Sequence, residues 1–398
     1  IEQRCGGPFS PIKCPQALPT KKDKDYDFSI KVNINLWTQC GWKNDEPVLD
    51  IGFFISKLSA AQTIRLYVPF VVDMSNLADL CECLSKDASL LGAVFNEPYT
   101  SADIPNQNKK ARVFEGDDSK VKFILYKLDF SSQNDVRLDS YRNGETQGTF
   151  LDFDAKNILG SIKEGDCQDY YLRFRIQSPE LRKCVREYEA PNRYFETLVN
   201  STYMVDMRFN NTRSMNRSLV QTLTTQNNYA LAPINGLHFL LMTKVDVDVS
   251  NDFNSSRVLE KKTWDEYVNL EGEGRTTEDI VAYHCSKKYD SKTISEGERV
   301  LKDIGSWEFF TRLKAGRCSV RTIFPYILLL ILFNVASNFV FNIIFSSLPQ
   351  GENGRVDYFP QIIALLIIAF ICCFILAKKK SQHSKNTKKN GKYIDKSC

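Results

Sequence analysis

One apolar segment near the C-terminus constrains the architecture of this chain more than any other feature of its sequence. Residues 323–348 (IFPYILLLILFNVASNFVFNIIFSSL) contain no ionisable side chain other than that of Tyr326. At about 1.5 Å per residue the segment forms a helix of about 39 Å, long enough to cross a hydrocarbon core of about 30 Å with some tilt. We therefore predict a first transmembrane helix over 322–348.

Polar side chains recur along one face of this predicted helix. Three asparagines follow one another at intervals of four residues, so they share a helix face. An amide in hydrocarbon is costly unless it finds a partner or water, and the face must therefore meet something other than lipid. The asparagine stripe consists of Asn334, Ser337, Asn338, Asn342 and Ser346.

A second apolar segment, 359–377, follows a short loop, 349–358, and completes a predicted transmembrane hairpin. Its interior offers the stripe little to bond with, since Gln361 stands at one end and Cys372 and Cys373 at the other. Two interpretations remain open. The asparagines bond to one another between helices of different protomers, or they line a water-filled pathway formed by several copies. Both predict a homo-oligomer.

Positive charge flanks both predicted spans, whereas the loop between them has a single Arg beside two acidic residues. Cytoplasmic flanks hold the excess of Lys and Arg, and the N-terminal IEQRCGGPFSPIKCPQ contains no apolar signal-peptide segment. We therefore expect an integral protein of the plasma or inner membrane with both termini in the cytoplasm. The Lys-rich tail, 378–398, is expected to bind anionic headgroups. The basic residues assigned to the interface are Arg317, Arg321, Lys378, Lys379 and Lys380.

The remaining residues, about 300, predict a domain in the cytosol. A quarter of the whole chain is charged, but the net charge is only +4, and eight positive charges lie in the tail. A general nucleic-acid binder normally shows a basic face or stripe. The charge balance therefore makes nucleic acid an unlikely partner and leaves an unknown ligand or protein.

Motifs for catalysis or metal binding are nearly absent, so we predict no enzyme, no cofactor and no metal site. The twelve cysteines are scattered without a C-x-x-C pair, and Cys81 and Cys83 are poor zinc ligands without a second pair. His284 and Cys285 are adjacent and point apart, which excludes a simple dyad. A loose nuclease-like set of carboxylates and a lysine is better explained by a solvated strand edge, and consists of Asp246, Asp248, Glu260 and Lys262.

Residues 1–25 are rich in Pro, Lys, Asp and Gly and are predicted to be poorly ordered. Between 26 and 300 the pattern predicts a strand-rich α+β domain with a mostly antiparallel mixed sheet, with a possible subdivision near 150–165. The polar stretch 96–119 is predicted to form a loop. Strands are predicted at 27–37, 49–55, 63–72, 121–128, 169–176, 203–209 and 237–249, and helices after Ser75 and near 256–270 and 291–304.

Two predicted strands suggest a binding site for phosphate or carboxylate. Alternation places Tyr171, Arg173 and Arg175 on one face of the first strand. If the strands are neighbours, these guanidinium groups converge with arginines of the second strand and its following loop. The alternative is ordinary pairing with acidic residues on a solvated sheet face. The further arginines are Arg208, Arg213 and Arg217.

The segment 301–321 joins this domain to the first span. Apolar residues recur there at intervals of three beside Arg and Lys, which suits an amphipathic helix at the headgroup boundary. A packed helix of the domain is the alternative. Trp307 and Phe310 are the aromatic residues assigned to the interface.

These observations predict a two-pass membrane protein whose cytosolic domain senses a ligand or partner and controls an oligomeric hairpin. Residues 323–333 form an apolar half that can block ions by dewetting, and the stripe forms a polar half that can hold water. The architecture resembles that of membrane-perturbing effectors of bacterial anti-phage defence, and the resemblance covers architecture alone. A tether that recruits a cytosolic partner is the alternative, and a membrane-anchored, nuclease-like enzyme is the third interpretation.

Overall fold

The computed structural model divides the chain into two compact units, one of residues 1–190 with 201–315 and one of 191–200 with 316–398. Elements on both sides of 150–165 belong to the first unit, so the predicted subdivision is not found there. The described residues are 10–15, 28–42, 46–116, 120–144, 146–160, 167–188, 200–211, 215, 217–224, 229–251, 253–270, 274–289, 303–316 and 320–346.

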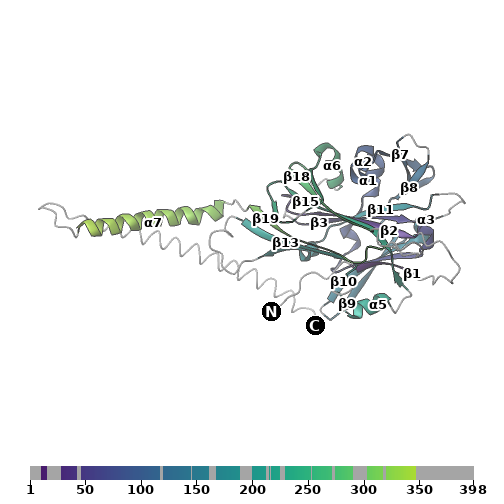
Figure 1. The fold of residues 1–398 in the computed structure, drawn as a ribbon, viewed down its shortest axis with the longest axis horizontal. Helices are drawn as coiled ribbons and strands as arrows, with labels where there is room; N and C mark the ends of the chain where they lie inside the picture. The colour runs from purple at the N-terminus through teal and green to yellow at the C-terminus, as the bar shows by residue number, and fades with distance from the viewer. Residues whose placement is uncertain are drawn as a thin grey trace, which may run out of the picture. The chain divides into compact units, whose positions relative to one another are not determined.

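A ten-stranded sheet forms the centre of the first unit (Figure 1). In spatial order its strands are β17 (Ser255–Val258), β18 (Ile280–Lys288), β15 (Ile234–Lys244), β2 (Ser29–Trp37), β3 (Val48–Ser56), β11 (Tyr170–Ile176), β8 (Val121–Tyr126), β7 (Gln107–Glu115) and β6 (Tyr99–Ile104), and the short β5 (Leu77–Asp79) pairs with β11. The pairs β15–β2 and β11–β8 are parallel, whereas the other described pairs are antiparallel. The prediction of a strand-rich mixed sheet is confirmed.

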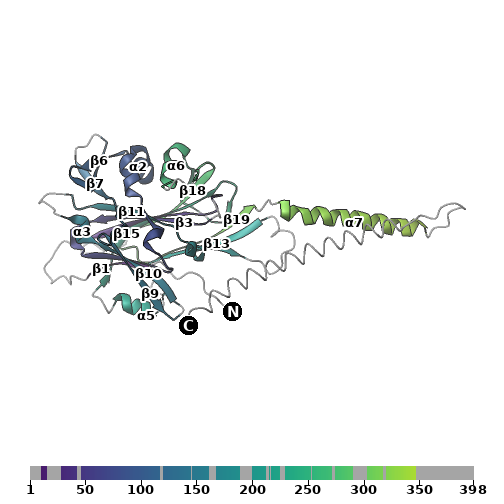
Figure 2. The same cartoon turned by 180° about the vertical axis from the view of Figure 1, so that it is seen from behind.

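Two smaller sheets form a second layer against one face of this sheet (Figure 2). The first contains, in order, β14 (Tyr229–Leu231), β1 (Ser10–Pro15), β4 (Thr63–Val68), β10 (Thr146–Asp154) and β9 (Val136–Asn143). The second contains β12 (Val185–Tyr188), β13 (Asn200–Phe209), β19 (Trp307–Gly316) and β16 (Asp248–Val249). Because β1 pairs with β4 and β14, the prediction that 1–25 is poorly ordered is wrong for Ser10–Pro15.

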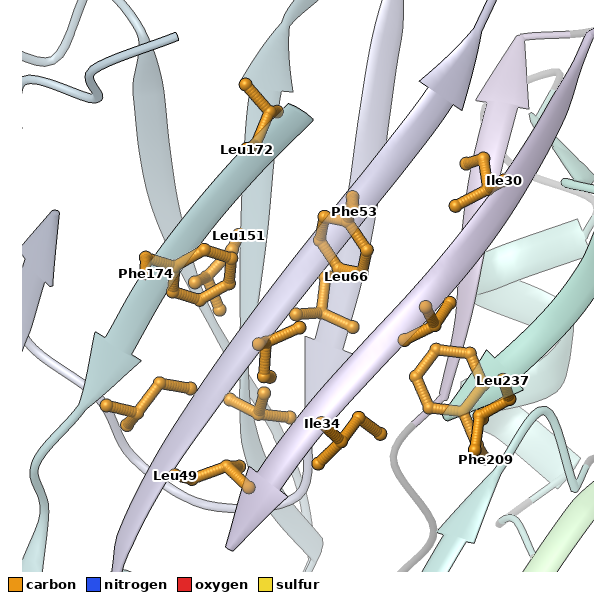
Figure 3. Close-up of a cluster of buried hydrophobic side chains, with 14 of the residues drawn as sticks. Ile30, Ile34, Leu49, Phe53, Leu66, Leu151, Leu172, Phe174, Phe209 and Leu237 are labelled. Atoms are coloured by element: carbon orange, nitrogen blue, oxygen red, sulfur yellow. The ribbon is translucent and has the colours of Figure 1, made fainter. Parts of the chain in front are cut away.

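The main hydrophobic core lies between these layers. Every second residue of the central strands points into it, as the two-residue period of a strand requires. In Figure 3, Phe53 of β3 and Phe174 of β11 lie beside Leu66 and Leu151, which come from the opposite layer, and Phe209 of β13 extends the cluster. The rings of Phe53 and Phe174 are 6.0 Å apart. Burial of this aromatic and branched aliphatic surface is the main stabilising term of the fold.

Short helices cover the other face of the ten-stranded sheet (Figure 1). They are α1 (Cys81–Lys86), α2 (Ala88–Phe95) and α6 (Lys261–Val268). The Asp87 side chain caps α2 by accepting from the backbone N–H groups of Ser89 and Leu90. A second core forms beneath the helices, with Trp37 and Tyr171 fully buried. Two further helices, α3 (Ala155–Leu159) and α5 (Arg217–Thr224), lie elsewhere in this unit.

Several predicted elements are wrong in kind. The stretch 96–119 contains the hairpin of β6 and β7 instead of a loop. The helix predicted after Ser75 is divided into the 3-10 turn Met74–Asn76, β5 and α1, and the helix near 256–270 shortens to α6 after β17. The helix predicted at 291–304 lies largely outside the described residues.

The amphipathic helix predicted over 301–321 is also wrong, because its core is the strand β19. Trp307, Phe309 and Leu313 are buried at odd positions, while Phe310 between them is 56% exposed. The odd residues form a strand face against Phe239 of β15. Trp307 is therefore a core residue and not a membrane-interface residue.

The second unit contains α7 (Val320–Ser346), a helix of 27 residues that includes Arg321 and the whole asparagine stripe. Within it, the Asn338 Nδ2 donates to the Asn334 Oδ1 at 3.1 Å. Among the residues that the structure describes, no helix meets the length and hydropathy required of a membrane span. The loop 349–358, the second predicted span and the tail with Lys378, Lys379 and Lys380 lie outside the described residues, as does Arg317.

Candidate functional site

The structure does not bring the predicted arginine cluster together. Arg173 and Arg175 lie on β11 of the ten-stranded sheet, and each is only 1% exposed. Arg208 lies on β13 of another sheet, where it forms a two-point bond with Asp206 of the same strand. Arg217 begins α5, and Arg213 lies outside the described residues. The alternative of a solvated sheet face does not hold either, because helices cover this face of β11.

Arg175 instead forms a buried ion pair with Asp50 of β3. Its Nε donates to the Asp50 Oδ1 at 2.7 Å and its Nη2 to the Oδ2 at 3.1 Å, while the Trp37 Nε1 donates to the same Oδ2 at 2.8 Å. Burial alone would raise the pKa of Asp50. The charges of Arg175 and Arg173 and the hydrogen bonds from Arg175 and Trp37 outweigh burial and hold this pKa below its usual value.

Arg173 is held by neutral oxygens in the same network. Its Nε donates to the Tyr267 hydroxyl and its Nη1 to the Tyr171 hydroxyl, both at 2.7 Å. The Tyr267 hydroxyl in turn donates to the Asp50 Oδ2 at 2.9 Å, and thereby connects α6 to the sheet. The arginines, Asp50, Trp37 and both tyrosines are all buried, so within the described part of the chain this network is closed to a ligand. We assign it to the positioning of α6 and not to binding.

A basic cleft is the better candidate for a binding site. It has a volume of about 720 Å³ and lies where β7, β8 and the start of β11 meet the end of β3 and α3. This volume falls within the range of about 300–1,000 Å³ that is typical of small-molecule sites. Among the described residues of its walls, Asp169 is the one carboxylate and five residues are basic, namely Lys57, Lys110, Arg112, Lys120 and Lys122.

Strand alternation places most of these cations on one face. Lys110 and Arg112 are two residues apart on β7, so their side chains leave the same side of the sheet. The antiparallel register sets Arg112 opposite Ile124 of β8, and Lys122 is two residues from Ile124 along that strand. The intervening residues, Ala111 and Val113 on β7 and Phe123 on β8, point to the opposite face and are buried in the second core.

The other wall of the cleft depends on the chain after β3. Lys57 adopts a left-handed conformation with φ of 53°, which is uncommon for a residue other than glycine. Its backbone N–H donates to the Asp169 Oδ1 at 3.1 Å, and the next N–H, of Leu58, donates to the Gln168 carbonyl oxygen at 3.0 Å. These bonds hold Lys57, Gln168 and Asp169 together at the rim.

The cations of the cleft differ in their internal contacts. Lys110 is 7% exposed, and its Nζ donates to the Leu159 carbonyl oxygen at 2.7 Å. Lys122 forms a 2.7 Å ion pair with Glu115. Arg112 is exposed on β7. Lys110 thus has a structural role in the wall, Lys122 is ion-paired, and the Arg112 side chain is exposed.

A histidine pair lies on the face of the ten-stranded sheet opposite the main core. The His238 Nδ1 and the His284 Nε2 are 3.1 Å apart, and the rings are stacked. Burial, followed by the neighbouring His284, Lys288 and Lys31, lowers the pKa of His238 to about 4. Among the described residues no group of three or more His, Cys, Asp or Glu side chains is placed to hold a metal ion. Cys81 and Cys83 form no disulfide bond with any cysteine whose side chain the structure describes.

The sequence alone does not predict this cleft, because the polar composition of 96–119 is typical of a loop. Two short signals in the sequence could have found it, namely the basic residues of KKAR at 109–112 and of KVK at 120–122. Read as paired strands, both segments place alternate basic residues on one face. The contribution of Lys57 has no comparable local signal, because it depends on contacts with residues more than a hundred positions away.

Comparison with known proteins assigns no family to the chain. No protein-family model matches it. No curated protein matches its sequence. The geometry of the cleft and the sequence of α7 are therefore the basis for a functional proposal.

Proposed function

We propose that the protein is a membrane-anchored sensor, in which the first unit binds an anionic ligand in the basic cleft and thereby controls a C-terminal transmembrane hairpin. One observation carries the proposal. A domain with a basic cleft of small-molecule size ends in β19 at Gly316, and only three residues separate this strand from the start of α7 at Val320. Because the connection is so short, we expect a conformational change of the domain on ligand binding to be transmitted to α7.

The sequence of α7 supports a hairpin that does more than anchor the domain. Residues 323–333 are apolar, whereas the asparagine stripe occupies the rest of the helix. Asn334 and Asn338 satisfy one donor and one acceptor between them, and each amide retains further hydrogen-bonding capacity. In the proposed assembly, several copies of α7 direct this capacity toward one another or toward water. Opening of the apolar half would then allow ions to cross.

The conductance of a C-terminal fragment tests the proposed role of the hairpin. Because β19 belongs to the sheet, the fragment begins at residue 317 and retains both predicted spans. We expect discrete conductance in a planar bilayer, and its loss when Asn334, Asn338 and Asn342 are changed to Leu. The matched control changes Val335, Phe339 and Ile343 to Leu, with the same spacing on a neighbouring face, and is expected to conduct. A fragment that assembles but never conducts would contradict the pore and favour a tether.

A further inference from the structure

We infer that the ligand of the basic cleft is a small molecule with two or more phosphoryl groups. This inference rests on the proposed function, since it names the ligand class of the same site. The cleft residues used in the argument are Lys57, Arg112, Lys120, Lys122, Gln168 and Asp169.

The number and spread of the cations favour more than one anionic group. The basic side chains come from three separate segments, namely the residue after β3, the strand β7 and the start of β8. A chain or ring with several phosphoryl groups could offer a separate anionic group to each of these segments. Among the described lining residues five side chains are basic and one, Asp169, is acidic, and Lys122 also pairs with Glu115.

The chemistry of the cations distinguishes phosphoryl groups from carboxylates. Arginine offers a planar, two-point geometry that matches carboxylate and phosphate alike, and Arg112 is the one arginine among the described lining residues. The other cations used in this argument, Lys57, Lys120 and Lys122, are lysines, whose ammonium groups act as point charges and suit the tetrahedral oxygens of phosphoryl groups. The set therefore fits a polyphosphoryl ligand better than a polycarboxylate.

The remaining walls provide a place for the rest of such a molecule. Ile104, Ile124 and Leu159 contribute apolar surface, and the Gln168 amide and Asp169 carboxylate offer polar groups at one rim. Most small-molecule sites combine apolar walls with a few such polar groups that fix orientation. The cleft thus has room and chemistry for a carbon skeleton beside its phosphoryl groups.

Binding to the full-length protein in detergent micelles tests the inference by calorimetry. The probes are tripolyphosphate, citrate and orthophosphate, at one ionic strength. We expect tripolyphosphate to bind at least tenfold more tightly than the other two. Citrate binding as tight as that of tripolyphosphate would overturn the choice of phosphoryl groups, and the absence of binding by all three would overturn the site. ATP and inositol trisphosphate then distinguish a nucleotide from a lipid headgroup as the source of the groups.

A matched pair of variants locates the bound probe. Arg112→Glu reverses a charge in the cleft on β7, and Arg142→Glu reverses the charge of an exposed arginine on β9, outside the cleft. Loss of one charge-assisted contact corresponds to about a tenfold weaker binding constant, and reversal should exceed this. Arg142→Glu is expected to bind as the wild type does. The inference would be overturned if both variants lost affinity for tripolyphosphate equally, or if neither variant lost affinity.

Arg112→Gln, with its unfolding temperature measured alongside, retains the test if the reversal variant fails to fold. It should bind tripolyphosphate about tenfold more weakly at an unchanged unfolding temperature. These measurements involve no conductance. Binding without conductance would therefore overturn the proposed control of the hairpin and leave the ligand class intact. Conductance without binding would overturn the ligand class and leave the proposed conducting hairpin intact.

Discussion

The Arg175 guanidinium and the Asp50 carboxylate form a two-point ion pair that is entirely enclosed between the ten-stranded sheet and α6. Both charged groups have lost their hydration on burial, and each is stabilised only while its partner is present. Removal of one partner should therefore destabilise the protein by more than the intact pair stabilises it. A substitution of either residue should have a large, measurable effect.

Asp50→Asn should strongly destabilise the protein. The substitution leaves Arg175 and Arg173 buried without a counter-ion, for which the expected loss in the free energy of unfolding is about 3–5 kcal/mol. Chemical denaturation of the full chain, monitored by tryptophan fluorescence, measures it. Glu82→Gln serves as the control, because it breaks the exposed ion pair with Lys86 and should change nothing measurable. A loss at Asp50 no larger than at Glu82 would contradict the buried network.

The same ion pair should make the free energy of unfolding depend on pH in the acid range. The pKa of Asp50 is held below that of the unfolded chain, so the stabilisation is fully present above the unfolded value near 3.8. It is lost as the pH falls through the folded pKa. Below the unfolded value, the free energy of unfolding of the wild type should therefore fall toward that of Asp50→Asn. A difference between the two proteins that stays constant with pH would refute the assignment.

Tyr267→Phe should cost less than the loss of the carboxylate. The phenol joins the Arg173 Nε to the Asp50 Oδ2, and its removal leaves one buried donor and one acceptor bond unmade. The expected loss is about 1–3 kcal/mol. Measurement of Tyr267→Phe, Asp50→Asn and the double variant as a cycle should give strongly non-additive losses. Additive losses would show that the phenol does not act through Asp50.

Histidine titration provides a further test of the outer sheet face. The pKa of His238 is lowered to about 4 by burial and by the positive charges of His284, Lys288 and Lys31. Between the unfolded value of about 6.5 and about 4, the unfolded chain binds more protons, so stability should fall as the pH falls through this window. The chain has only three histidines, and substitution of each to Gln assigns their NMR signals. Titration of His238 near 6.5 would contradict its enclosed position.

The sequence identified β11 and its two faces correctly, because strict alternation over 169–176 has no other simple explanation. It did not reveal that α1, α2 and α6 cover the face with Arg173 and Arg175. Arginine on a strand usually indicates solvent, and the partner carboxylate, Asp50, is 125 positions away. Contacts at that separation leave no local trace in the chain.

Two other differences have a similar origin. In β19 two apolar periods overlap in the sequence. Trp307, Phe310 and Leu313 recur at intervals of three, as in a helix, whereas Trp307, Phe309 and Leu313 lie at even spacings, as on one face of a strand. The buried face follows the strand period. In β6 and β7 the strands are polar because one side of the hairpin faces solvent. A polar edge hairpin has the composition of a loop, so the basic cleft beside it could not be predicted from composition.

Ligand-dependent conductance of the full-length protein in a planar bilayer tests the central claim most directly. Tripolyphosphate is added on the side of the first unit, to the wild type and to Arg112→Glu. The account predicts conductance that changes with tripolyphosphate in the wild type and requires at least tenfold more of it in the variant. Conductance that ignores tripolyphosphate, or that responds equally in both proteins, would contradict control of the hairpin by the basic cleft.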